Sequence, residues 1–87
     1  MKKFTFDYAI NTKTDERIDD INRTYDNFET LDGMMAQMAD DYAESCLLLN
    51  EESRSYDLDN MCVRMTFSNI ETDETEDHIV YAKEIEE

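Results

Sequence analysis

Carboxylates are the residues in this chain whose number and spacing suggest chemistry. The sequence holds 23 Asp and Glu against eight Lys and Arg, which gives a formal net charge of −15 in 87 residues. Many of these acids lie close together. They include the i,i+4 pairs Asp15/Asp19, Glu16/Asp20 and Asp40/Glu44, and the group Glu71, Asp73, Glu74, Glu76 and Asp77. Clustered carboxylates can bind metal ions, transfer protons or bind the cations of a partner.

The acidic stretches lack the spacing of a dedicated metal site. Asp57-Leu58-Asp59-Asn60 begins like an EF-hand calcium loop, but Cys62 stands where that loop requires glycine and Ser68 where it requires glutamate. Cys46 and Cys62 match neither a zinc pattern nor a disulfide framework, so we expect two reduced thiols. We therefore predict that the protein binds no metal and no cofactor.

Patterns of catalytic residues are also missing. His78 is the single histidine, and we expect it to be an exposed strand residue with acidic neighbours. No Ser or Thr lies in a nucleophile-elbow context. With one glycine the chain has neither a phosphate-binding loop nor a dinucleotide fingerprint. We predict a protein that is not an enzyme and has no catalytic residues.

Two helices are expected to carry the first acidic pairs. Between Asp15 and Phe28, apolar residues recur at helical spacing, with Thr12 or Thr14 as N-cap. A second helix is expected from Thr30 to Asn50, capped by Thr30 or Asp32, with Asp40, Asp41 and Glu44 on its polar side. Its apolar stripe comprises Leu31, Met35, Met38, Tyr42, Cys46 and Leu49, widened by Met34, Ala39, Ala43 and Leu48.

Three strands complete the expected fold. Phe4, Phe6, Tyr8 and Ile10 alternate with polar residues, as do Met61, Val63, Met65 and Phe67, and a third strand is expected over 79–85. The polar stretch 51–60 and the acidic stretch 69–77 are expected to be loops. We predict a single α+β domain over residues 1–87 with the order β-α-α-β-β. Its three-stranded antiparallel sheet, in strand order 1-2-3, carries two antiparallel helices on one face.

The net charge limits the choice of partner. A magnitude of roughly 2–8 is enough to keep a small domain soluble. A charge of −15 opposes direct binding to nucleic acid or anionic membrane and favours a basic protein surface. The sequence has no hydrophobic segment of a signal peptide and no apolar run of membrane-span length. We expect a cytoplasmic protein that is a monomer or a weak dimer.

Three interpretations of the acids compete: a solvated surface, a nonspecific acidic interaction tail, and mimicry of a nucleic-acid backbone. Spread evenly over the surface, the acids would lie roughly 15 Å apart, too sparse to imitate one phosphate charge per about 1.7 Å of duplex. The clusters bring them closer, although like charges at i,i+4 reduce helix stability. The repetition of such pairs therefore favours a compensating role in binding.

In size, acidity, lack of catalytic residues and small α+β layout, the chain resembles phage-encoded DNA-mimic inhibitors of the anti-CRISPR and anti-restriction classes. This resemblance implies a non-catalytic inhibitor that occupies the DNA-binding channel or PAM-reading surface of a CRISPR effector, or the DNA site of a restriction enzyme, in the host cytoplasm. Arg17, Arg23, Arg54 and Arg64 are expected to be internal charge partners. The residues expected to bind the partner are Asp15, Glu16, Asp19, Asp20, Asp40, Asp41, Glu44, Glu71, Asp73, Glu74, Glu76 and Asp77.

Two alternatives stay open. An antitoxin or immunity protein would neutralise a basic nuclease toxin through the same kind of acidic surface. A small structural subunit would instead bury apolar surface, such as Tyr56, Leu58 or the free face of the sheet, against a stable partner.

Overall fold

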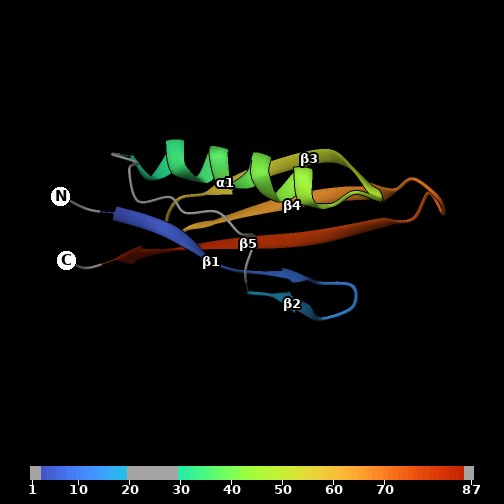
Figure 1. The fold of residues 1–87 in the computed structure, drawn as a ribbon, viewed down its shortest axis with the longest axis horizontal. Coiled ribbons are helices and arrows are strands. Elements are labelled where there is room, and N and C mark those ends of the chain that lie inside the picture. The colour runs from blue at the N-terminus through green and yellow to red at the C-terminus, as the bar shows by residue number, and fades with distance from the viewer. Residues whose placement is uncertain (1–2, 20–29, 86–87) are drawn as a thin grey trace.

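An antiparallel sheet with a helix across one face forms the fold (Figure 1). A computed structural model describes residues 3–19 and 30–85 of the chain. Five strands within these residues form one sheet in the order β2-β1-β5-β4-β3, and all neighbouring strands are antiparallel. The elements are β1 Lys3–Asn11, β2 Glu16–Ile18, α1 Leu31–Ser45, β3 Leu49–Asp57, β4 Cys62–Asn69 and β5 Thr75–Ile85.

This architecture corrects the predicted β-α-α-β-β fold. Instead of three strands and two helices, the described residues form five strands and one helix. Glu16–Ile18, expected to be helical, pairs with β1, and most of the polar stretch 51–60 belongs to β3. The predicted strand order is also wrong, because β5 lies between β1 and β4. Residues 20–29 of the expected first helix lie outside the described residues.

The β1–β2 hairpin forms because turn-forming side chains follow β1. The Asn11 side chain accepts a hydrogen bond from the Lys13 N–H at 3.0 Å, and the Asn11 carbonyl accepts one from the Asp15 N–H at 2.8 Å. Thr14 Oγ1 accepts from the Glu16 N–H, and Asp15 has a φ of 59°. Asn and Thr favour turns through such local bonds, so Thr14 serves the turn and does not cap a helix.

Helix α1 begins where the sequence predicts. Thr30 has an extended backbone, and its Oγ1 accepts a hydrogen bond from the Gly33 N–H at 3.4 Å, which satisfies one free donor of the first turn. The helix ends at Ser45, five residues earlier than expected. There the Cys46 N–H bonds back to the Ala43 carbonyl, and β3 starts at Leu49.

The core lies between α1 and one face of the sheet. The helix contributes five of the predicted apolar residues, and the strands contribute alternating side chains from β1, β4 and β5. Leu48 is an exception to the predicted stripe, since 53% of it is exposed. The buried hydrophobic side chains are Met34, Met35, Met38, Ala39 and Tyr42 of the helix, and Phe4, Phe6, Ala9, Val63, Met65, Phe67, Val80 and Ala82 of the sheet.

A bulge in β1 interrupts the alternation that the sequence predicts. Phe6 pairs with Ala82, but the next paired residue is Tyr8, which lies opposite Tyr81. The register shift leaves Phe6 on the helix side and places Tyr8 on the open face of the sheet, which is the face away from α1. There the Tyr8 ring stacks on that of Tyr81 with 4.7 Å between centroids. The Arg17 guanidinium lies 4.1 Å from the centroid of the Tyr8 ring.

Strand β3 is polar because an ion-paired arginine takes the place of an apolar residue. Arg54 lies opposite Met65 in the register, and its Nη1 lies 2.9 Å from Asp40 Oδ1 on α1. Its Nη2 donates to Glu51 Oε1 at 2.6 Å. The hydrogen bonds to Glu51 hold the Arg54 pKa well above its ordinary value. The predicted role of Arg54 as an internal charge partner is confirmed.

Gly33 and Thr30 should be coupled in stability. A Cβ on Gly33 would lie 2.9 Å from Thr30 Oγ1, so Gly33→Ala displaces the capping hydroxyl. The cap contributes about 1 kcal/mol, and Ala in place of Gly gains about 0.5–1 kcal/mol in a helix. We expect Gly33→Ala to leave the free energy of unfolding nearly unchanged in the natural chain but to raise it by about 0.5–1 kcal/mol in a Thr30→Ala background.

Urea denaturation of the two single variants and the double variant measures this coupling. Strictly additive effects would show that the contact between position 33 and the Thr30 hydroxyl has no energetic consequence.

Candidate interaction surface

Three connections of the chain meet at one end of the molecule, which we call the turn end: residues 12–16, 44–48 and 70–74 (Figure 1). The Thr12 N–H and Oγ1 both donate to the Asp77 carbonyl at 2.9 Å. The Ile70 N–H donates to the Leu48 carbonyl at 3.0 Å. These contacts connect both hairpins and the end of α1, so charges on the three segments share one surface.

The structure divides the predicted partner-binding residues into two groups. Asp40 and Asp41 lie on α1 one helical turn before the turn end. Asp19 follows β2 and pairs with Arg17 at 2.7 Å, Asp77 bonds to Thr66, and Glu76 lies half-buried beside His78. Asp20 lies outside the described residues. The acids that the fold places at the turn end, all with exposed side chains, are Asp15, Glu16, Glu44, Glu71, Asp73 and Glu74.

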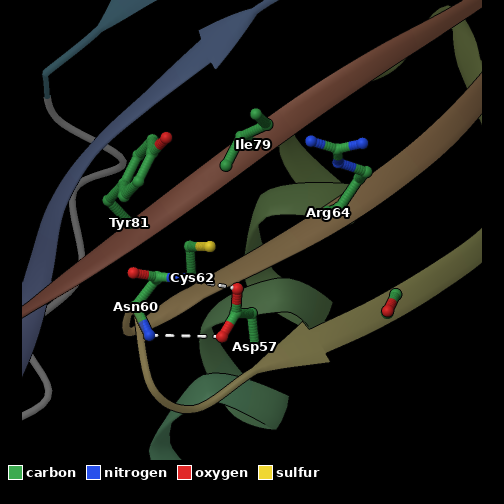
Figure 2. A pocket seen from close by; sticks show the side chains of 7 residues that line it. Asp57, Asn60, Cys62, Arg64, Ile79 and Tyr81 are labelled. Carbon is green, nitrogen blue, oxygen red and sulfur yellow. Dashed lines mark hydrogen bonds between the residues drawn. The ribbon is translucent and has the colours of Figure 1, made fainter.

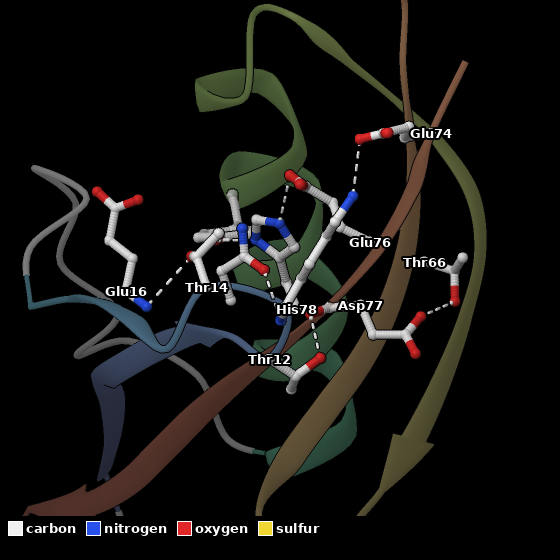
Figure 3. Close-up of polar contacts among 11 residues, drawn as sticks. Thr12, Thr14, Glu16, Thr66, Glu74, Glu76, Asp77 and His78 are labelled. Carbon is white, nitrogen blue, oxygen red and sulfur yellow. Dashed lines mark hydrogen bonds and ion pairs between the residues drawn. The ribbon is translucent and has the colours of Figure 1, made fainter. Parts of the chain in front are cut away.

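Cations are scarce at the turn end. Among the residues that the structure describes there, Lys13 is the one base, and its Nζ lies 2.8 Å from Glu74 Oε2 (Figure 3). This hydrogen bond raises the pKa of Lys13 and lowers the pKa of Glu74. The pair is exposed and is screened by solvent, so it contributes little to stability. The other five acids of the turn end have no ion pair with a described residue.

The direction of α1 adds to the negative potential. The carboxyl end of a helix carries a partial negative charge that favours basic residues. The last turn of α1 contains no base and instead carries Glu44. Asp32 lies in the first turn, where the helix dipole favours an acid. Glu44 thus opposes the helix dipole.

The β4–β5 turn is held by its own hydrogen bonds. The Asn69 side chain accepts from the N–H groups of Glu71 and Thr72, at 2.8 and 3.2 Å. The Asn69 N–H donates to the Glu74 carbonyl, and Asp73 has a φ of 58°. The expected loop 69–77 is therefore shorter than predicted, and strand pairing resumes at Thr75.

His78 is buried, and the prediction of an exposed strand residue is wrong. The β5 register places it on the helix side of the sheet, with 4% of the residue exposed. The Tyr42 hydroxyl and His78 Nδ1 form a hydrogen bond at 2.6 Å. The other ring nitrogen, Nε2, lies 3.0 Å from Glu76 Oε1 (Figure 3). The Phe67 ring packs edge-on against the imidazole at 4.9 Å between centroids. These contacts hold His78 in the core. Its acidic neighbours in the sequence do not indicate this burial.

A pocket of about 500 Å³ lies on the open face of the sheet, away from α1 (Figure 2). Asp57 at its edge accepts hydrogen bonds from the Asn60 side chain and N–H, which lower the Asp57 pKa. Arg64 has no ion-pair partner among the described residues, contrary to the expectation of an internal partner. The pocket thus combines charges of both signs and differs in character from the turn end. Its lining residues are Ser55, Asp57, Asn60, Cys62, Arg64, Ile79 and Tyr81.

The residues of the metal-binding type are dispersed in the part of the chain that the structure describes. Within residues 3–19 and 30–85, no three His, Cys, Asp or Glu side chains converge as metal ligands would. Cys46 and Cys62 are both free and half-buried, and burial raises the pKa of each thiol. No helix in the same ranges is long and apolar enough to cross a membrane.

Replacing Tyr42 should change both the stability and its dependence on pH. Tyr42→Phe leaves the buried His78 Nδ1 without its hydrogen-bond partner, so we expect the free energy of unfolding to fall by about 1–3 kcal/mol at pH 7. Burial raises the pKa of Tyr42 above its ordinary value of 10.0. Above pH 10 the unfolded chain therefore releases this proton before the folded one, and the free energy of unfolding falls as pH rises.

Tyr42→Phe lacks this group, so the stability difference between the natural chain and the variant should narrow above pH 10. Urea denaturation from pH 7 to 11 tests both effects. A difference that stays constant over this range would contradict the buried, protonated state of the hydroxyl.

Comparison with known proteins assigns the chain to no family. No protein-family model matches it, and neither the curated proteins nor the solved structures contain a significant match. The charges, contacts and exposed residues of the turn end are therefore the features that bear on function.

Proposed function

We propose that this protein is a non-catalytic inhibitor that covers the basic nucleic-acid-binding surface of a defence nuclease in the cytoplasm of the host cell. The target is an RNA-guided nuclease complex or a restriction enzyme. The observation that carries the proposal is the turn end, where three separate segments present six exposed carboxylates beside a single described base. Carboxylates in this arrangement take the places of backbone phosphates.

The linear charge density supports mimicry. The chain carries a net charge of −15, and the longest dimension of the structure is 45 Å. This corresponds to about one net charge per 3 Å, roughly half the density of duplex DNA, which has one phosphate per about 1.7 Å. The concentration of acids at the turn end raises the local density above this average. A groove that binds duplex DNA would meet a field of the same sign at the turn end.

Unfavourable electrostatics in the free protein also support charge mimicry. Glu44 lies in the last turn of α1, where the helix dipole is unfavourable to acids, and it has no ion pair with a described residue, whereas Asp40 one turn earlier is paired with Arg54. The folded protein therefore carries repulsion that Lys and Arg side chains of a partner would relieve. The same field would accelerate encounter with a basic partner through electrostatic steering.

Charge reversal at the turn end should abolish most of the inhibition. The test variant combines three exposed acids whose side chains make no ion pair with a described residue: Glu16→Lys, Glu44→Lys and Glu71→Lys. The matched control makes the same change in net charge at the opposite end: Asp32→Lys, Asp59→Lys and Glu84→Lys. We expect the test variant to inhibit at least tenfold less well, equivalent to about 1.4 kcal/mol, and the control to change little.

The assay measures DNA cleavage by a purified guide-loaded RNA-guided nuclease and by purified restriction enzymes, with urea denaturation to confirm folding. Equal loss of inhibition in both variants would show that net charge alone acts. The absence of inhibition of every nuclease by the natural chain would refute the proposed function.

Association should depend steeply on salt. Exposed charges are screened over about 10 Å at 0.1 M ionic strength. We expect the association rate with the inhibited nuclease to fall by about an order of magnitude between roughly 50 and 200 mM salt. Duplex DNA should compete for the same site. Stopped-flow or biosensor measurements give the rate, and a rate independent of salt would count against charge mimicry.

A further inference from the structure

Three of the most exposed large hydrophobic residues lie at the turn end. Leu47 is 85% exposed, Leu48 53% and Ile70 52%. Leu47 and Leu48 belong to the connection between α1 and β3, and Ile70 belongs to the β4–β5 turn. The hydrogen bond from the Ile70 N–H to the Leu48 carbonyl, at 3.0 Å, places the two connections side by side. We call these three residues the apolar knob.

The knob stands on a backbone that is already ordered. The Leu49 N–H donates to the Cys46 carbonyl at 3.1 Å, which closes the connection that carries Leu47 and Leu48. On the other side, the Asn69 side chain holds the turn that follows Ile70. Because the backbone of the knob is already ordered, binding to a partner costs little additional conformational entropy. The exposed side chains are therefore suited to act as anchors.

Carboxylates flank the knob on both of its chain segments. Glu44 lies in the last turn of α1, just before Leu47, and Glu71, Asp73 and Glu74 follow Ile70 in the β4–β5 turn. An apolar centre within a charged rim is the usual arrangement of an interaction site, where a few desolvated anchors supply affinity and the rim supplies orientation and encounter rate.

The sign of the rim determines the occupant. A second copy of this chain would bring the same carboxylates against the knob, and an anionic lipid surface or a nucleic acid would be repelled in the same way. A basic protein surface with an apolar depression satisfies both parts of the site. We propose that Leu47, Leu48 and Ile70 insert into such a depression within the basic nucleic-acid-binding surface of the partner. This inference rests on the proposed function, because it assigns the apolar anchor within the same interface.

Two synthetic peptides of equal positive charge separate the apolar contribution from the electrostatic one. One is an oligolysine, and the other is an amphipathic Lys/Leu helix. Titration calorimetry at low salt should show that the natural chain binds the Lys/Leu peptide at least tenfold more tightly than oligolysine. A double variant, Leu47→Ser with Ile70→Ser, should lose most of this excess and keep its affinity for oligolysine within twofold.

Leu58→Ser is the matched control, because Leu58 is 48% exposed in the β3–β4 turn at the opposite end. It should change neither affinity. The expected shifts in amide NMR spectra on adding the Lys/Leu peptide lie in residues 44–52 and 69–75. Surface substitutions of this kind leave folding largely intact, and urea denaturation of each variant verifies this.

The outcomes distinguish the inference from the proposed function. If the natural chain binds both peptides equally, or if the double variant keeps the excess, the apolar anchor is refuted while charge-based binding stands. If the natural chain binds neither peptide, the proposed function fails as well. Sedimentation that shows a dimer of the natural chain, lost in the double variant, would identify a second copy as the occupant and overturn the inference.

Discussion

Burial of one face of α1 against one face of the sheet is the contact that holds this domain together. The helix supplies Met34, Met35, Met38 and Tyr42, all fully buried, and the strands supply Phe67 opposite them. A domain of this size buries only about 60–65% of the surface that its unfolded chain exposes, so the folded state is stable by only a small margin of free energy. The net charge of −15 acts against this margin, since compaction brings the acids together. The hydrogen bond between Tyr42 and His78 joins the helix to β5, and the ion pair between Asp40 and Arg54 joins it to β3.

The position of the acids follows from this arrangement. The interface between α1 and the sheet contains few charged residues, and many of the acids lie instead in the connections of the turn end. Lys13 and Arg54, two of the described bases, form intramolecular ion pairs with acids. What remains at the turn end is carboxylate without an internal counter-charge, next to leucine and isoleucine side chains that the core does not use. This combination is what distinguishes a prospective interface from an ordinary solvated surface.

Strong local patterns were sufficient to predict part of the fold. The alternation from Met61 to Phe67 predicted β4, and the helical spacing after Thr30 predicted α1. Strand β3 could not be found in this way, because Glu51 and Arg54 occupy half-buried positions where an apolar residue would indicate a strand, and its pairing with β4 is made by backbone bonds. The strand Glu16–Ile18 was missed because the apolar residues between Asp15 and Phe28 recur at helical spacing, whereas the turn chemistry of Asn11 and Thr14 decided the outcome.

The candidate site was predictable in its charge but not in its apolar part. The acids at 71–74 were identified from their density in the sequence. Leu48 was assigned to the core because it extends the helical stripe, but the helix ends at Ser45, before that residue. The burial of His78 depends on the β5 register, which brings Tyr42 to its ring. Such contacts between distant segments leave no local signal.

The place of β5 in the sheet has a consequence for biosynthesis. It is the last described strand in the chain, yet it pairs with both β1 and β4 and joins the two halves of the sheet. As a nascent chain leaves the ribosome, β1 and β2 are translated long before their central neighbour. The pairing of β1 with β5 spans most of the chain length, and such distant contacts slow folding. The β1–β2 hairpin must therefore wait, with one edge of β1 unpaired, until β5 has been translated.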